Sequence, residues 1–354
     1  MKNIAEIDKN FAESHRIDEK VRGLYDFYDI DSSPFSVHGV FREGERYVRM
    51  PLDLAESINP PLKGLSRCTA GGRVRFVTDS PSVALVVISK SCDVNVHFAY
   101  AGKTGFDIYA TDEDEMRYFG TYLPPLSFED GYEGLVYLDG RKTRTVCINF
   151  PLYNGVKQVF VGIERGSSLQ PAQPLLQPPV VYYGSSITQG GCASRPGNCY
   201  QAILHRHLKR DYINLGFSGN ARAEEAMMDY IASLDMGLFV YDYDHNSPND
   251  EHLAATHHSG YKKIRAAHPD IPIIMMTRPK YHLTKGELGR NAIIRESFER
   301  GISEGDKNLY FVDGRELLLP TARENSLVDN CHPTDLGFFG MAERLLPLMK
   351  KLTE

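Results

Sequence analysis

The hydrophobic pattern of this chain changes its period near residue 170, and one regular architecture cannot accommodate both patterns. From residue 36 to 165, short runs rich in valine, isoleucine, phenylalanine and tyrosine are separated by glycine, aspartate, proline and serine. Runs of strand length with such turn residues between them are typical of antiparallel strands. The sequence therefore predicts an antiparallel β-sandwich over residues 36–165.

The second half of the chain alternates between strand-like and helix-like segments. Residues 222–234 and 335–351 carry apolar side chains at helical spacing, and they follow or separate short apolar runs typical of buried strands. Those runs lie at 180–184, 212–216, 237–241, 271–276 and 308–312. Strands that alternate with helices indicate βαβ units with a parallel sheet. We expect this domain over residues 180–354, with its ligand beyond the carboxyl ends of the strands.

Two further segments complete the expected organisation. Residues 166–179 contain four prolines and three glutamines without any period, which predicts a linker between the two domains. Residues 1–35 are polar and of mixed charge, and we expect them to form an N-terminal arm or a helix.

Composition limits the classes of partner. A net charge of −6 and a pI near 6.1 argue against nucleic acid or an anionic membrane. The first residues lack the apolar stretch of a secretory signal, so we expect a cytoplasmic protein without membrane partners. The six cysteines show no CxxC spacing and are interpreted as reduced thiols. No glycine-rich phosphate-binding motif is present, and we expect no cofactor.

A pair of serines lies directly behind the first predicted strand of the second half. The strand 180–184 runs into Ser185 and Ser186 through Gly184. A serine at a strand-to-loop turn is presented to solvent, next to backbone N–H groups that can bind an anion. The alternative interpretation is that both serines merely cap a helix.

Single polar or glycine residues follow the next two predicted strands. Gly219 can adopt a positive φ and direct its N–H into a cleft, or it can be an ordinary turn glycine. Asn246 can donate its side-chain N–H to a developing oxyanion, or it can belong to an ordinary polar loop.

Near the C-terminus, Asp329 and His332 lie three residues apart, just before a segment that is predicted to be helical. A carboxylate at this spacing can hold an imidazole in one tautomer while the other ring nitrogen faces a serine. A purely structural histidine before Pro333 is the alternative.

These motifs indicate more about function together, in their order along the chain, than each one does alone. A serine, a glycine, an asparagine and a D-x-x-H motif follow successive strands, and together they resemble the SGNH (GDSL-type) family of serine esterases and acylhydrolases over about residues 178–352. The resemblance implies a flavodoxin-like three-layer α/β/α domain, preceded here by a jelly-roll-like sandwich. It also implies roles for five residues: a Ser186 nucleophile, the triad partners His332 and Asp329, and oxyanion donors Gly219 and Asn246 beside the Ser186 N–H.

The match departs from the family pattern at two positions. Ser185 stands where the family usually has aspartate, and Asp244 stands where it commonly has glycine. The run at 184–197 is similar to a bacterial subgroup with an N-terminal sandwich. In that sandwich, residues 105–110 (GFDIYA) resemble a G-x-D-L-Y motif, with isoleucine in place of leucine.

Four residues are candidate substrate-binding groups: Tyr109, Arg195, Arg278 and Asp244. The alternative for Tyr109 is a buried residue of an ordinary strand, and the alternative for both arginines is an exposed or ion-paired side chain.

Other polar residues of the sequence give weaker indications of a functional site. Asp242, Asp244 and His245 lack any familiar ligand spacing, so we expect no metal. His257 and His258 are expected at the surface of a helix. Cys331 is not favoured as a nucleophile, because a residue adjacent to His332 points away from its imidazole.

The sequence thus predicts a two-domain, metal-independent serine esterase that acts on an O-acyl ester. The expected partner is a small-molecule or oligosaccharide ester, with acetyl as the expected acyl group. The sequence leaves open whether the protein forms homo-oligomers. An acyltransferase that uses the same acyl-enzyme is one alternative. A carbohydrate-binding protein with an inactive hydrolase fold is another, and the intact serine, asparagine, aspartate and histidine argue against it.

Overall fold

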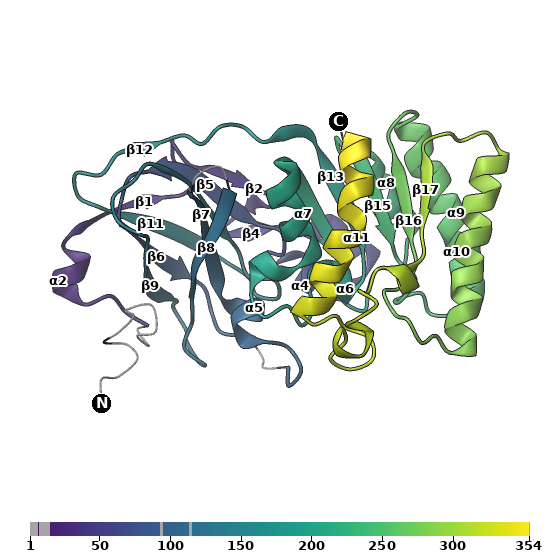
Figure 1. Ribbon diagram of the computed structural model, residues 1–354, viewed down its shortest axis with the longest axis horizontal. Coiled ribbons are helices and arrows are strands. Elements are labelled where there is room, and N and C mark those ends of the chain that lie inside the picture. The colour runs from purple at the N-terminus through teal and green to yellow at the C-terminus, as the bar shows by residue number, and fades with distance from the viewer. Residues whose placement is uncertain (1–5, 7–14, 93–94, 113–114, 354) are drawn as a thin grey trace. The chain divides into compact units, whose positions relative to one another are not determined.

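The computed structural model describes residue 6 and residues 15–92, 95–112 and 115–353 (Figure 1). The chain forms two compact units. Unit 1 comprises Met1–Arg49, Arg67–Pro174 and Ser194–Gly197, and unit 2 comprises Met50–Ser66, Leu175–Ala193 and Asn198–Glu354. Within the described residues, no helix combines the length and the apolar character that crossing a bilayer requires.

Unit 1 is built on two antiparallel sheets. The first has the order β1-β11-β6-β9, and its strands are Tyr25–Asp29, Gln158–Glu164, Ser82–Ile88 and Tyr132–Tyr137. The second has the order β12-β5-β10-β7-β8, with β2 also paired to β5. Its strands are Leu169–Gln170, Arg73–Thr78, Arg144–Asn149, Phe106–Asp112, Glu115–Tyr122 and, for β2, Ser36–His38. Unit 1 also contains a hairpin of β3 (Phe41–Glu43) and β4 (Arg46–Val48) and the short helices α2 (Glu19–Arg22) and α5 (Tyr100–Thr104).

The inner faces of these two sheets share one hydrophobic core, as predicted for a sandwich. Val83 and Leu85 of β6 and Val161 of β11 pack in it with Phe76 of β5 and Ile148 of β10. Because side chains alternate along a strand, a strand that buries every second residue in this core directs the others away from it. In β7, Phe106, Ile108 and Ala110 belong to the core, so Asp107 and Tyr109 lie on the opposite face.

Unit 2 is built on a five-stranded parallel sheet of order β14-β13-β15-β16-β17. The strands are Arg210–Gly216, Leu176–Gly184, Leu238–Asp242, Ile273–Met276 and Leu309–Val312. All five coincide with predicted strands, and the first strand in sequence lies second in the sheet. This 2-1-3-4-5 order is the flavodoxin-like arrangement. The second strand is added on one side of the first strand, and the remaining strands are added on its other side.

Helices cover both faces of the parallel sheet, which gives unit 2 its three layers (Figure 1). On one face, Val181 and Tyr183 of β13 pack with residues of the helices α3 (Leu52–Ile58), α4 (Pro60–Ser66), α8 (Glu225–Ala232), α9 (Asp250–Ala267) and α10 (Lys285–Ser303). On the other face, the Tyr182 ring lies 5.6 Å from that of Tyr200, and its hydroxyl contacts Met349. These two residues belong to α7 (Tyr200–Leu208) and α11 (Asp335–Thr353). The α/β/α prediction is confirmed.

The division of the chain differs from the predicted one in three places. Residues 25–29 form β1 and pair with β11, although they lie in the segment expected to be an arm. Residues 52–66 form α3 and α4, because their apolar side chains at helical spacing include Ala55 and Leu62 of the unit 2 core. The segment 166–179 contains β12 and the start of β13, since backbone pairing with β5 and β14 compensates for its lack of hydrophobic period.

Candidate active site

The two adjacent serines have different local tasks. Strand β13 ends at Gly184, and the short helix α6 (Ser186–Gln189) begins two residues later. Ser185 is the N-cap, with extended backbone (φ −82°, ψ −162°) and a side-chain oxygen that accepts the Ile187 N–H at 3.2 Å. The capping interpretation therefore holds for Ser185, and it leaves Ser186 at the first position of the helix.

Glycine is required before this pair of serines. A Cβ atom on Gly184 would lie 2.1 Å from the Thr188 hydroxyl oxygen and 2.2 Å from the Asp242 carbonyl oxygen. Both distances are far inside van der Waals contact, so a side chain would displace α6 or β15. The sharp turn between strand and helix therefore depends on Gly184.

Ser186, His332 and Asp329 form a continuous hydrogen-bonded chain. The Ser186 Oγ lies 2.8 Å from His332 Nε2, and His332 Nδ1 lies 2.7 Å from Asp329 Oδ2. The second carboxylate oxygen, Oδ1, accepts the backbone N–H of His332 at 2.7 Å and that of Cys331 at 3.1 Å. One carboxylate thus fixes both the ring of His332 and the backbone that carries it.

The loop that carries Asp329 and His332 is closed by local interactions. The Val328 N–H donates to the His332 carbonyl at 2.8 Å, and Leu327 forms an isolated β-bridge with Pro333. Asn330 has a φ of 63°, a left-handed conformation that asparagine tolerates better than most residues. The D-N-C-H order therefore suits a tight turn in which the aspartate reaches back to the histidine.

The electrostatics of the Asp329 carboxyl favour its ionised form. Burial disfavours the charge, but hydrogen bonds from the backbone and ring of His332 and from the Cys331 N–H outweigh burial and lower the pKa of Asp329. Ser186 itself is 8% exposed and His332 is partly buried. A carboxylate that stays charged beside a partly buried imidazole can stabilise that ring when it takes up a proton.

Gly219 and Asn246 lie in the segments that follow β14 and β15. Gly219 has a φ of +70°, and among the described residues no atom outside its immediate chain neighbours lies within 4 Å of where a Cβ would be. Its backbone conformation, not crowding, therefore favours glycine. Asn246 Oδ1 accepts the Ala221 N–H at 3.4 Å, which orients its Nδ2 group as the donor toward other partners.

The Gly219 segment is also attached to the helix of the nucleophile. The buried side chain of Gln189 in α6 accepts the Ser218 N–H at 3.0 Å through Oε1. Gln189 was not among the residues predicted for the site. Its position four residues after the N-cap serine, on a helix too short to pack by itself, is the signal that points to a tertiary partner.

Residues 177–350 match the GDSL-like lipase/acylhydrolase family. The chain belongs to this family. Residues 25–169 match the family of N-terminal domains of SGNH-hydrolase-type esterases that carries the GxDLY motif. The protein is therefore an SGNH-type hydrolase with the N-terminal domain that the sequence predicted.

Solved structures with the same architecture include three that differ in described activity. A protein from Bacteroides ovatus, described as a GDSL-like lipase, is 26% identical with a TM-score of 0.83. A salicylyl-acyltransferase from a tetracycline biosynthetic pathway is 19% identical with a TM-score of 0.74. An acetyl xylan esterase from Butyrivibrio proteoclasticus is 13% identical with a TM-score of 0.60. Each match covers 93% of this chain and 98% of the other. No match was found among curated proteins.

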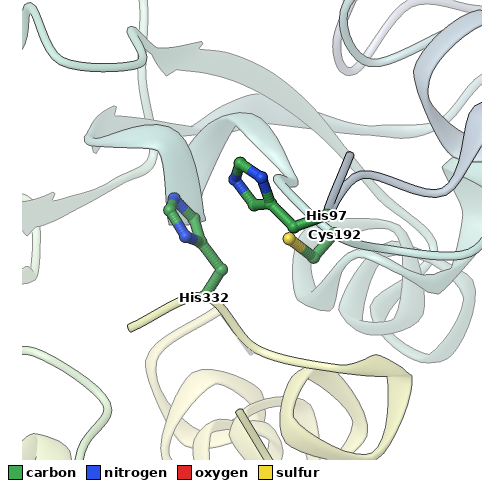
Figure 2. Close-up of side chains that lie close together, drawn as sticks. All are labelled: His97, Cys192 and His332. Atoms are coloured by element: carbon green, nitrogen blue, oxygen red, sulfur yellow. The ribbon is translucent and has the colours of Figure 1, made fainter. Parts of the chain in front are cut away.

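Cys192 lies close to the His332 ring, and Cys331 directly precedes His332 in the chain. Cys192 Sγ lies within 4.8 Å of a ring nitrogen of His332 (Figure 2). Burial raises the pKa of Cys192 to about 12 and that of Cys331 to about 11. Since the thiolate is the reactive form, both thiols are poor nucleophiles near neutral pH, which agrees with the choice of Ser186 over Cys331.

His245 connects the segment after β15 with the loop that carries His332. Its Nδ1 lies 3.6 Å from Cys331 Sγ, and its Nε2 lies 3.8 Å from Asp244 Oδ1. Burial lowers the pKa of His245 to about 4, so this imidazole is neutral under ordinary conditions. From the sequence, His245 was weighed only as a metal ligand, and its contact with Cys331 was not predicted.

Asp244 and Arg278, two of the substrate-binding candidates, bind each other. The Arg278 Nε donates to Asp244 Oδ2 at 2.9 Å, and its Nη1 donates to Glu287 at 3.0 Å. Lys280 also donates to Glu287 at 3.0 Å. Burial opposes ionisation of Glu287, but hydrogen bonds from Thr284 and Lys280 and the charge of Arg278 lower its pKa to about 2. A substrate role for Asp244 and Arg278 stays a prediction.

The other two candidates, Tyr109 and Arg195, also contact each other, within unit 1. Arg195 donates to the Tyr109 hydroxyl and, at 2.9 Å, to Asp107 Oδ2. Tyr109 is 4% exposed, which matches the alternative interpretation of a buried strand residue. Substrate binding by this pair stays a prediction, and Asp107 is a polar residue that the sequence analysis did not select.

The expectation that His257 lies at the surface was wrong. It is fully buried on the inner face of α9, where its ring stacks on Tyr241 with centroids 4.5 Å apart. Its Nδ1 lies 2.9 Å from the Ser297 hydroxyl. Burial lowers the pKa of His257 to about 3, so it belongs to the core as a neutral ring. His258, its neighbour in sequence, is only partly buried.

Proposed function

We propose that this protein is a metal-independent serine esterase that removes short acyl groups, acetyl above all, from O-acyl esters of a carbohydrate or related small molecule. The observation that carries the proposal is the continuous hydrogen-bonded chain from Asp329 through His332 to Ser186. Membership of the GDSL-like lipase/acylhydrolase family supports ester chemistry at these residues.

In the proposed reaction, Ser186 Oγ attacks the acyl carbonyl carbon while His332 Nε2 takes the hydroxyl proton. Asp329 accepts the hydrogen bond from His332 Nδ1 and stabilises the imidazolium. The tetrahedral intermediate collapses, His332 protonates the leaving alkoxide, and the acyl group stays on Ser186. His332 then takes a proton from water, and the hydroxide attacks the acyl carbonyl carbon. The tetrahedral intermediate collapses as His332 returns this proton to Ser186 Oγ, which releases the carboxylic acid.

The negative charge on the carbonyl oxygen needs donors throughout this sequence. We assign this task to the backbone N–H groups of Ser186 and Gly219 and to the side-chain amide of Asn246. The left-handed conformation of Gly219 and the fixed orientation of Asn246 support the assignment. Removal of one such donor typically costs about 2.7–4 kcal/mol of transition-state stabilisation.

The carbohydrate part of the proposal rests on fold and domain composition. Several structures that share the two-domain fold are described as family two carbohydrate esterases or as an acetyl xylan esterase. Their sequence identity to this chain is low, so they support the fold directly and the substrate class only as a hypothesis. An acyltransferase would use the same acyl-enzyme with an alcohol in place of water, and the product distinguishes the two reactions.

The test combines a covalent probe with product analysis. A fluorophosphonate should label wild-type protein at Ser186, and Ser186→Ala should lose both labelling and turnover. Ser185→Ala is the matched control, because it removes only a helix cap, at a cost of about 1 kcal/mol in stability, and keeps the nucleophile. A panel of acetylated sugars, assayed for free acetate, then identifies the substrate.

Persistent labelling of the Ser186→Ala variant would disprove the nucleophile assignment. Acetyl transfer to an added alcohol without release of acetate would replace the esterase with an acyltransferase. Labelling without turnover of any acetylated sugar would contradict the substrate class alone.

A further inference from the structure

We propose that Asp107 is a positioning residue for the esterase reaction. Through Arg195 and Gly197 it fixes the segment Ser194–Gly197, and thereby the turn that follows the nucleophile helix α6. This inference rests on the proposed function of Ser186, and it gives the G-x-D-L-Y motif of the sandwich a role in catalysis without contact to the substrate.

Asp107 is a fully buried carboxylate with donors at both oxygens. Its Oδ2 accepts the Gly197 backbone N–H at 2.8 Å and the Arg195 Nη1–H at 2.9 Å. Its Oδ1 accepts the Asn149 side-chain N–H at 2.8 Å. Hydrogen bonds to an ionised acceptor are about twice as strong as neutral ones, and a buried carboxylate is costly without them. The segment is therefore held by charge as well as by shape.

The aromatic residues of the second sheet complete the anchor. Tyr109 accepts a hydrogen bond from Arg195 and donates one to the Gly197 carbonyl at 3.5 Å. The Arg195 guanidinium lies over the Tyr118 ring, 3.9 Å from its centroid. A Cβ on Gly197 would come within 2.5 Å of the Tyr109 ring and 2.7 Å of Asp107 Oδ2, so the backbone approaches these side chains as closely as glycine permits.

The anchored segment is a short extension of the chain that carries the nucleophile. The N–H groups of Gly190 and Gly191 both donate to the Ser186 carbonyl, at 3.1 and 2.8 Å. The turn then passes through Cys192, whose φ of 72° is uncommon for a residue with a side chain. Such a conformation persists when the surroundings hold it, and Ser194–Gly197 follows within two residues.

Asn198, the residue after this segment, binds the start of the helix that follows His332. Asn198 donates its side-chain N–H to Asp335 Oδ2 at 2.8 Å. Asp335 is the first residue of α11, three residues after His332. The chain thus runs from the turn after Ser186 through the segment Ser194–Gly197, which Asp107 binds, to Asn198, whose side chain binds Asp335.

The burial of Tyr109 separates this role from substrate binding. A side chain that is 4% exposed, with its hydroxyl engaged by Arg195 and Gly197, offers little surface to a sugar. Loss of the anchor should therefore change how well Ser186 is placed for attack, not how tightly an ester binds. A misplacement of about 1 Å at a reacting group can cost on the order of 10²-fold in rate.

The experiment uses the full chain and p-nitrophenyl acetate, a small ester that needs little beyond the triad. Asp107→Asn and Arg195→Ala should each lower kcat by roughly 10- to 100-fold with little change in KM. Fluorophosphonate labelling of Ser186 should slow by a similar factor. The double variant should be no worse than the more damaging single variant, because both remove one interaction.

Three further variants keep the test informative if these substitutions impair folding. Arg195→Lys retains the charge and should recover part of kcat relative to Arg195→Ala. Tyr109→Phe removes one hydroxyl, keeps the ion pair and should have a smaller effect. Arg117→Gln is the matched control, because it removes an exposed ion pair to Asp139 in the same unit and should leave kcat unchanged. Circular dichroism at the assay temperature checks that each variant is folded.

Unchanged kcat in folded Asp107→Asn and Arg195→Ala would overturn the inference. A rise in KM for acetylated sugars with normal p-nitrophenyl acetate turnover would overturn it too, in favour of substrate binding by Arg195. Ser186→Ala separates this failure from the other. If that variant stays active, the proposed function fails, whereas if it is inactive and the anchor variants are normal, only the positioning role fails.

Discussion

Asp242 gives the stability of unit 2 a pH dependence that one substitution should remove. This carboxyl is fully buried at the end of β15, where Oδ2 accepts the Thr188 hydroxyl at 3.0 Å and Oδ1 has no partner among the described residues. Burial, together with the nearby charge of Asp244, raises the pKa of Asp242 from 3.8 to about 7. The folded state therefore favours the neutral acid.

The sign of the effect follows from linkage. The unfolded chain loses the Asp242 proton near pH 4, while the folded chain keeps it until about pH 7, so the folded state loses stability as pH rises through this window. A shift of about three pKa units corresponds to a penalty on the order of 4 kcal/mol above pH 7. Between pH 5 and pH 8 the penalty grows by about 2–3 kcal/mol.

Asp242→Asn should remove this dependence. The amide keeps an acceptor for Thr188 but buries an N–H group at the site of Oδ1, at a cost of about 1–3 kcal/mol that does not vary with pH. We expect the variant to be less stable than wild type at pH 5 and equal or more stable at pH 8. Urea unfolding followed by circular dichroism across this range measures the difference, with exposed Asp235→Asn as control. Parallel curves for wild type and Asp242→Asn would refute the reasoning.

Four further outcomes are expected. Asp329→Asn should lower kcat by about 10⁴-fold in a folded protein, because the amide no longer selects the productive imidazole tautomer. Asn246→Ala should lower kcat by about 10²–10³-fold with little change in KM, and a larger effect on KM would argue against the oxyanion role. Burial lowers the pKa of His257 from 6.5 to about 3. The stability that the buried neutral ring contributes is therefore fully present above pH 6.5, and it is lost as pH falls from 6.5 to about 3. His257→Gln should flatten this part of an acid-unfolding profile, and an unchanged profile would exclude the residue as its cause. EDTA should leave turnover of p-nitrophenyl acetate intact, and activity that is lost and then restored by zinc would revive a metal mechanism.

Local sequence was sufficient for those parts of the molecule that depend on neighbours along the chain. The five parallel strands follow from apolar runs, because a strand buried on both faces is apolar at most of its positions. Asp329 and His332 are three residues apart, so a single turn brings the carboxylate to the ring. Gly184 precedes the serines because the sharp turn from strand to helix leaves no space for a side chain there.

Tertiary structure decided which distant segments meet. Ser186 and His332 are 146 residues apart, and only the order of the parallel strands places both at one edge of the sheet. Periodicity shows that a residue is buried but not what covers it. For this reason the helices at 52–66 were assigned to the wrong half of the chain, and His257 was placed at the surface although Tyr241 covers it. For the same reason, the G-x-D-L-Y resemblance includes Asp107 but does not give its partners, since Arg195 and Gly197 lie 88 and 90 residues away.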